Sequence, residues 1–403
     1  MKPSAAPKKN SMIVLYIIIY ATMFLFGLIE NVKGVSYPLI KAEFGVNYDS
    51  QGGLVSTTIL GYVLFCLIAS IFLHRYGIKR SILAGYLAVC VGAVAAMVSP
   101  SFWTAAGTLL IVNAGFGFFE VGANALASVV FTSRAALMMN LMHFFYGFGA
   151  IAGPKAAGIL TDTFYLTWRQ VYLMIILPTA AVALFIMFTR FRGRAASKDS
   201  TGEETRKISF RSALKNPVVW IFCLTLGFME VFEFGAANWG GLYLKDIYGL
   251  DPRVAGASFV SLFYIQFTIA RLFGGLIIEK AGYMSSLIIS VIGTMAVFLI
   301  GFLLGAAGIW VLPTTGLFIG IMWPTLMAVA MRFFGSDAPT MTSVIITISG
   351  AVNALFQLVI GLTNYYAGEA WGYRSCLVYA TLTLLLLFIL SARLKQPYSS
   401  PAQ

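Results

Sequence analysis

Charged side chains are scarce in this chain of 403 residues: they make up 10% of it, whereas soluble domains have about a quarter. Apolar residues make up 59%, and the mean hydropathy is +0.86. Such a composition excludes a soluble protein. Apolar runs near or above the ~20 residues that cross a bilayer recur along the whole chain. They indicate an integral membrane protein with helical spans rather than a barrel of short strands.

Histidine and cysteine are also rare, with two and four residues respectively. All four cysteines lie in apolar runs at spacings that suit no metal, so we expect small core residues rather than disulfides or ligands. The chain has no nucleophile elbow and no phosphate-binding loop. These absences argue against an enzyme, and we expect neither a metal nor a cofactor. A sensor would need an output domain, which the short polar central segment does not supply.

We expect an all-α membrane protein with twelve spans. Their ranges are 12–36, 51–74, 81–99, 102–130, 136–163, 168–190, 217–245, 252–277, 284–305, 308–334, 340–367 and 371–393. The first is not expected to be a signal peptide, because its apolar stretch is long, no small-residue cleavage site follows it, and eleven more spans come after it.

The net charge of +12 does not indicate nucleic acid, because its placement follows the spans. With the N-terminus inside, the cytoplasmic segments hold 19 of the 27 lysines and arginines, the outer loops hold five, and three lie within spans. This asymmetry is the one expected for a multi-pass protein of the cell membrane, here with both termini in the cytoplasm.

The only long polar stretch, 191–216, divides the chain into an N-terminal bundle, 1–190, and a C-terminal bundle, 217–403. The two halves resemble each other. The segment His74-Arg75-Tyr76-Gly77-Ile78-Lys79-Arg80 follows the second span, and Glu279-Lys280-Ala281-Gly282-Tyr283 follows the eighth, with the glycines 205 residues apart. Two pseudo-twofold-related bundles of six helices are typical of a transporter that works by alternating access.

Twelve spans, a basic turn after spans two and eight and a basic central loop together resemble the major facilitator superfamily. Within it, three segments resemble the fucose-galactose-glucose proton-symporter family. They are Glu120-Val121-Gly122-Ala123-Asn124, the segment 140–154 that contains His143 and Pro154, and Gly320-Ile321-Met322-Trp323-Pro324-Thr325. The resemblance implies a role for Glu120 in proton coupling or in binding sugar hydroxyls. The acid that this family carries late in span one falls on Gly34 here, which leaves Glu30 as a displaced substitute.

Glu120 and Asn124 lie one helical turn apart within an apolar run, with Phe116 one turn before them. Burying a carboxyl in a membrane is costly, and apolar surroundings favour its neutral form. We therefore expect Glu120 to bind and release the coupling proton, with Asn124 as a substrate contact. A permanent structural hydrogen bond between them is the alternative.

Glu30 and Lys33 are three residues apart near the outer end of span one and can form an ion pair. They could simply neutralise each other, or Lys33 could compete with a proton or a sodium ion for Glu30. We assign Glu30 to proton coupling, Lys33 to gating and the intervening Asn31 to substrate binding.

In span seven, Glu230 and Glu233 are followed by Asn238, Trp239 and several glycines that would permit a broken helix. Acids, an amide and an indole suit a sugar, whose hydroxyls need acceptors and whose ring stacks on aromatic faces. A solvated outer vestibule is the alternative reading of this segment.

Other polar residues within or beside the spans complete the candidates. Asn353 and Gln357 lie one turn apart in span eleven and could donate and accept hydrogen bonds, so they are assigned to substrate binding. His143 is assigned to the same group, although it could relay protons or serve packing instead. Arg75, Lys155 and Arg271 are assigned to gating. We expect Arg271 to lock the inner gate or anchor a helix end, with substrate binding as the alternative, and Lys155 could do either.

The leading hypothesis is a proton-coupled symporter for a hexose-like sugar, functional as a monomer in the lipid bilayer, with Na⁺ as the other conceivable coupling ion. The segment 149–158 also resembles a glycine-proline motif of drug-proton antiporters, although its small residues could serve helix packing alone. Export of an amphipathic or cationic compound is therefore the second hypothesis.

Overall fold

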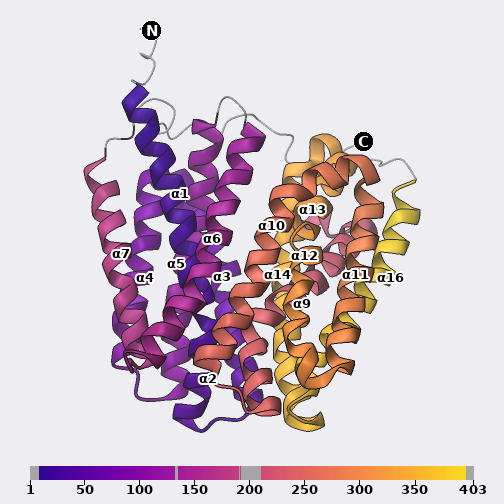
Figure 1. Cartoon of the computed structure of the whole chain (residues 1–403). Helices are drawn as coiled ribbons and strands as arrows, with labels where there is room; N and C mark the ends of the chain where they lie inside the picture. The colour runs from indigo at the N-terminus through magenta and orange to yellow at the C-terminus, as the bar shows by residue number, and fades with distance from the viewer. Residues whose placement is uncertain (1–8, 132–134, 190, 192–209, 396–403) are drawn as a thin grey trace. The chain divides into compact units, whose positions relative to one another are not determined.

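The computed structural model describes residues 9–131, 135–189, 191 and 210–395, and within these residues it is helical with no strand (Figure 1). The helices up to residue 189 are α1 Lys9–Asn31, α2 Lys33–Phe44, α3 Tyr48–Tyr76, α4 Ile78–Met97, α5 Phe102–Val130, α6 Ala135–Asp162 and α7 Trp168–Phe188. Those that follow residue 209 are α8 Phe210–Ala213, α9 Pro217–Tyr248, η2 Pro252–Gly256, α10 Ala257–Ala281, α11 Tyr283–Leu303, η3 Gly305–Trp310, η4 Leu312–Thr314, α12 Thr315–Ile319, α13 Met322–Phe334, η5 Gly335–Asp337, α14 Ala338–Ala367, α15 Trp371–Arg374 and α16 Cys376–Arg393.

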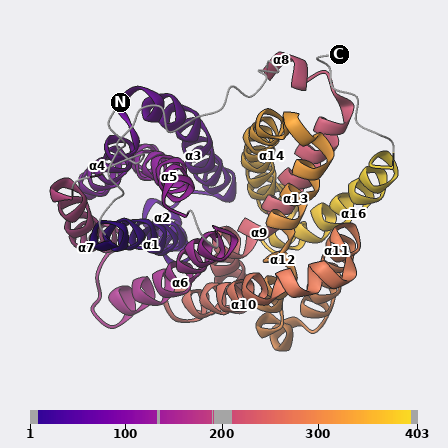
Figure 2. The ribbon, with the colours of Figure 1, turned by 90° about the horizontal axis from the view of Figure 1, so that it is seen from above.

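The chain forms two compact units. The first comprises Met1–Gly45 and Thr57–Gly202, and the second comprises Val46–Ser56 and Glu203–Gln403. Within the first unit, α1 packs along α6, and α4 packs between α5 and α7 (Figure 2). Within the second, α9 packs against α14 and α16, and α10 packs against α12. The start of α3 belongs to the second unit, although the rest of this helix belongs to the first.

Eleven of the twelve expected spans match described helices that are long and apolar enough to cross a membrane. The fifth expected span, 136–163, matches α6, a helix of 28 residues that is not among the eleven. The all-helical fold class expected from the sequence is therefore confirmed.

Two spans are interrupted where the sequence analysis expected continuous helices. Span one is interrupted at Val32, where α1 gives way to α2, and it continues to Phe44 rather than ending at residue 36. Span ten consists of η3, η4, α12 and α13, with Gly320 and Ile321 between the last two. Discontinuous helices are common near the sites of secondary transporters.

The broken helix that the glycines of span seven would permit is not formed, because α9 is a continuous helix of 32 residues. Its glycines serve packing instead. A Cβ at Gly240 would lie 2.6 Å from a ring carbon of Phe259, and one at Gly235 would lie 2.9 Å from the sulfur of Cys376. The small residues let neighbouring side chains lie against the helix backbone.

The two halves share one turn conformation at the glycines that the sequence places 205 residues apart. Gly77 has φ 84° and ψ 167°, and Gly282 has φ 83° and ψ 153°. Each glycine N–H bonds to the carbonyl four residues earlier, and each carbonyl accepts from the serine four residues later, Ser81 or Ser286. The backbone repeat thus matches the repeat in the sequence.

We expect Gly282→Ala to destabilise the protein by about 1–3 kcal/mol, because only glycine adopts this backbone region without strain. Nothing lies within 4 Å of a Cβ built on Gly282, so the loss would come from the backbone alone. The melting temperature of the purified protein measures it. Gly275→Ala, also in open space but without a positive φ, is the control and is expected to melt like the parent protein. Equal melting of both variants would contradict the argument.

Three glycines bring the backbones of α1 and α6 into direct contact. A Cβ built on Gly27 would lie 2.0 Å from the carbonyl oxygen of Tyr146. One built on Gly149 would lie 2.0 Å from the carbonyl oxygen of Phe24, and one built on Gly153 would lie 2.1 Å from that of Leu28. No side chain fits at these positions. We call Gly27, Gly149 and Gly153 the glycine seam.

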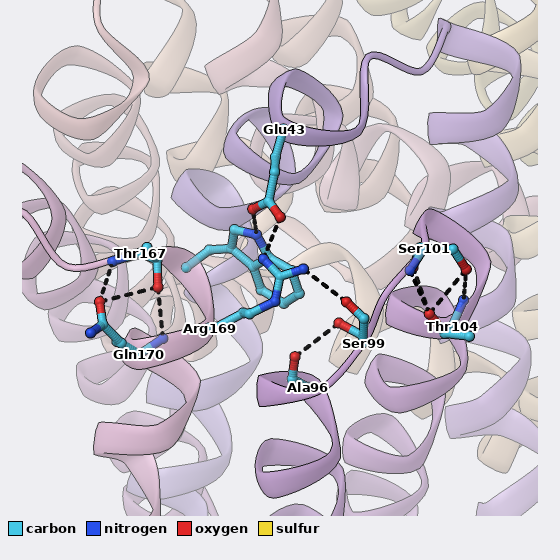
Figure 3. A network of polar contacts seen from close by, with 9 residues as sticks. Glu43, Ala96, Ser99, Ser101, Thr104, Thr167, Arg169 and Gln170 are labelled. Atoms are coloured by element: carbon cyan, nitrogen blue, oxygen red, sulfur yellow. Dashed lines mark hydrogen bonds and ion pairs between the residues drawn. The ribbon is translucent and has the colours of Figure 1, made fainter.

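A polar cluster joins α2, α7 and the loop after α4 in the first unit (Figure 3). The Arg169 guanidinium forms an ion pair with Glu43 and donates to the Ser99 carbonyl at 2.9 Å. The indole of Trp168 donates to the other Glu43 oxygen at 2.6 Å. Thr167 and Gln170 form a capping box at the start of α7. This cluster fixes the ends of three helices.

Outside the spans, Asp251 caps η2 by accepting from the Arg253 N–H at 2.8 Å. The Arg253 side chain also donates to this carboxylate, which holds the pKa of Asp251 below its usual range.

Candidate functional site

Glu120 and Asn124 form a hydrogen-bonded pair on α5 in the first unit. The Asn124 amide donates to both the backbone oxygen and the Oε1 of Glu120, each at 2.8 Å. Both residues are half-buried, while Phe116, one turn earlier, is buried. A primary amide can bond to a carboxylate or to a carboxylic acid. The pair can therefore keep its geometry when the carboxyl gains or loses a proton.

Aromatic side chains of α1, α3 and α5 pack together in the same unit. The ring of Phe26 stacks on that of Phe116 at 5.0 Å between centroids, and Tyr62 lies 6.2 Å from Phe26. The Tyr62 hydroxyl is close enough to interact electrostatically with both Glu30 and Glu120. Tyr62 on α3 thus links Glu30 on α1 and Glu120 on α5 electrostatically within the first unit.

Glu30 and Lys33 lie on either side of the interruption at Val32. The Lys33 ammonium contacts Glu30 Oε1 at 3.4 Å, and the Tyr146 hydroxyl of α6 donates to Glu30 Oε2 at 2.5 Å. Between them, Asn31 is fully buried and donates to the Gly27 carbonyl at 2.9 Å. Its Oδ1 atom has no hydrogen-bond partner within the described part of the chain. The sequence-predicted residues of span one are thus brought together, with Tyr146 added.

Glu230 lies at the start of a polar row in the second unit. The Ser349 hydroxyl contacts its Oε1 at 3.4 Å, and the Trp323 side chain of α13 also hydrogen-bonds to it. Glu233, one turn along α9, is close enough to interact with Glu230 electrostatically. Two acids, an indole and a hydroxyl are therefore assembled from three helices.

Three buried polar residues form a row along α14, each four residues from the next: Ser349, Asn353 and Gln357. The Gln357 amide donates to Asn353 Oδ1 at 3.2 Å and to the Val231 carbonyl at 3.1 Å. The Trp239 indole donates to Gln357 Oε1 at 2.7 Å. We call Ser349, Asn353 and Gln357 the α14 polar row.

Asn238 lies beside Trp239 on α9 and is 2% exposed. Among the residues that the structure describes, neither its side-chain oxygen nor its nitrogen has a hydrogen-bond partner. An unpaired amide is costly to bury, so a bound hydroxyl or a water molecule would stabilise it. This property suits the substrate-binding role predicted for Asn238.

Besides Lys33, the residues predicted to gate or relay are Arg75, Lys155, Arg271 and His143. Arg75 and Lys155 are exposed at the end of α3 and on α6, and His143 is half-buried on α6. The Arg271 guanidinium donates to the Gly320 carbonyl at 3.1 Å, which lies at the interruption of span ten, and lies over the Phe267 ring at 4.2 Å.

The sequence analysis missed four partners of the predicted residues: Tyr62, Tyr146, Ser349 and Trp323. Their residue types are common in apolar helices, and each acquires its role through a contact with another helix. Trp323 was available as part of the quoted segment 320–325, but only as a carrier of the resemblance.

The family model of the Major Facilitator Superfamily matches residues 19–362, so the chain belongs to this superfamily. It is a multi-pass membrane transporter of small molecules and not an enzyme. The L-fucose-proton symporter of Escherichia coli is 23% identical over 404 residues, with 90% of each chain covered.

Two solved structures resemble the fold. The E. coli fucose:proton symporter FucP has a TM-score of 0.64 at 22% identity, covering 96% of this chain and all of that one. The nucleoside transporter NupG has a TM-score of 0.75 at 14% identity, also covering 96% of this chain and all of that one. At these identities the two structures support the fold alone.

Proposed function

We propose that this protein is a proton-coupled symporter of a hexose-like sugar in the plasma membrane, with both termini in the cytoplasm. The observation that carries the proposal is the Glu120–Asn124 pair, a carboxyl held by a neutral amide inside an apolar helix. Such a carboxyl can change its charge without losing its partner, as a proton carrier must. The likeness to the L-fucose-proton symporter supports the same class of substrate and coupling ion.

The second unit supplies the groups that a sugar needs. Hydroxyls require both donors and acceptors, and the α14 polar row with Glu230 and Asn238 offers carboxylate, amide and hydroxyl groups. Trp239 and Trp323 add indole rings of the kind that pack against sugar faces. The proposal therefore assigns proton binding to the first unit and hydroxyl recognition to the second, in a protein that works as a monomer.

Uptake into proteoliposomes tests the function. Labelled fucose, galactose and glucose are offered under an inward proton gradient, and under an inward sodium gradient at equal pH. Accumulation that disappears when the proton gradient is removed supports the proposal, whereas sodium-dependent accumulation would replace the proton by Na⁺. If no hexose accumulates and the proton gradient drives a hydrophobic cation outward, the antiporter hypothesis replaces the symporter.

We expect Gln357→Ala to raise the KM for the transported hexose about 10- to 100-fold, because a hydroxyl of the bound sugar would lose its amide partner at about 1–3 kcal/mol. The Trp239 indole and the Val231 carbonyl lose the same amide with and without substrate, so that loss is expected to lower the melting temperature rather than to change the KM. Thr363→Val is a matched control on α14, since the Thr363 hydroxyl bonds only locally, to the Val359 carbonyl at 2.8 Å. Concentration-dependent initial rates measure both. An unchanged KM in Gln357→Ala would remove this residue from the substrate site.

A further inference from the structure

Both oxygens of the Glu30 carboxylate have a partner at the interruption of span one. Lys33 contacts Glu30 Oε1 at 3.4 Å, and Tyr146 donates to Oε2 at 2.5 Å. The side chains of Lys33 and Glu30 are 9% and 12% exposed. A buried carboxylate with a cation and a hydroxyl as partners is compensated within the protein.

The cation that compensates Glu30 is part of the chain. A proton or a sodium ion that neutralises a carboxylate is taken from one side of the membrane and released on the other. The Lys33 ammonium is covalently part of the chain, three residues after Glu30, and cannot be released. Glu30 therefore has a counter-ion that uses no ion gradient.

Glu120 has a partner of a different kind. Asn124 contributes an amide, which is neutral and accepts either protonation state of the carboxyl. The two acids of the first unit thus differ in the chemistry that holds them, one by a charge and the other by a neutral donor.

Other ionisable groups lie around Glu30. Tyr37 and Tyr62 interact with it electrostatically, and Tyr62 also faces Cys66 and Glu120. Tyrosine and cysteine are ordinarily neutral at physiological pH. Among these neighbours, Lys33 is therefore the group that supplies the positive charge to Glu30.

We propose that Lys33 is the built-in counter-ion of Glu30 and replaces one coupling ion, so that a single proton, bound at Glu120, accompanies each substrate molecule. This inference rests on the proposed proton-coupled transport. It makes Glu30 and Lys33 a positioning pair that holds the interruption of span one, rather than a second proton site.

The reversal potential of hexose flux in proteoliposomes gives the number of protons per substrate. We expect a single proton for the parent protein. In Lys33→Gln, Glu30 loses its cation and must bind a proton to be neutral, so the number is expected to rise to two, with the pH optimum shifted towards acid. The double variant Glu30→Gln/Lys33→Gln is expected to return to one. Two protons in the parent protein, or an unchanged number in Lys33→Gln, would overturn the inference.

Thermal unfolding tests the pair without any substrate. We expect Glu30→Gln and Lys33→Gln each to lower the melting temperature by roughly 5 °C or more at pH 7, because each leaves one buried charge unpaired. The double variant should recover most of the loss, and Lys33→Gln should melt higher at pH 5 than at pH 7. Additive losses in the double variant would refute the pair even if no hexose is transported. If hexose uptake fails but the melting temperatures of the single and double variants are as expected, the proposed function is refuted and the Glu30–Lys33 pair is still supported.

Discussion

Replacing Glu120 with glutamine is expected to abolish accumulation of the sugar against its gradient while leaving exchange of labelled for unlabelled sugar in place. Glutamine has nearly the same shape, and its side-chain oxygen can still accept from Asn124, but it binds no proton. For each proton that moves with the substrate, a gradient of one pH unit corresponds to about 1.4 kcal/mol and so to about tenfold accumulation. The variant is expected to reach equal concentrations on both sides.

Glu279→Gln is the matched control for this experiment, because it makes the same chemical change at an exposed position near the end of α10. It should accumulate the sugar like the parent protein. Accumulation by Glu120→Gln at the level of this control would move the coupling site to another carboxyl. Loss of both accumulation and exchange would instead show that Glu120 is needed for binding or folding.

The glycine seam is expected to tolerate no side chain at all. In Gly153→Ala the new Cβ would lie 2.1 Å from the Leu28 carbonyl oxygen, so the two backbones would have to separate. Overpacking of this kind costs about 1–3 kcal/mol, and contact with backbone rather than with a flexible side chain places the change at the upper end of that range. We expect a melting temperature several degrees lower and less monodisperse protein on size exclusion.

Gly107→Ala provides the comparison, because Gly107 is exposed on α5 and nothing lies within 4 Å of a Cβ built there. Alanine also favours a helix over glycine by about 1 kcal/mol, so this variant should melt at or above the temperature of the parent protein. Similar melting of Gly107→Ala and Gly153→Ala would mean that α1 and α6 are not held in contact by the seam.

Much of the fold follows from composition and periodicity. Long apolar runs are sufficient to locate the spans, because a bilayer leaves the backbone few alternatives to a helix. The interruptions at Val32 and at Gly320–Ile321 were not predicted. The glycines of α9 would have permitted a break, but this helix is continuous. Glycine in an apolar helix is compatible with a break or with close packing, and the neighbouring helix decides between them.

The site residues divide in the same way. Glu120–Asn124 and Glu30–Lys33 are pairs within one helical region, so their spacing in the sequence is sufficient to predict the contacts that the structure contains. Tyr146, Trp323 and Ser349 reach their acids from other helices, and a single sequence gives no sign of such contacts.

The glycine seam also limits how the first unit can move. Because the backbones of α1 and α6 touch at Gly27, Gly149 and Gly153, neither helix can slide along the other without its carbonyls colliding. Glu30 on α1 and Tyr146 on α6 are therefore expected to move together with the two helices. A bend at Val32, beyond the end of the seam, would move Lys33 and α2 and would leave Glu30 in place on α1.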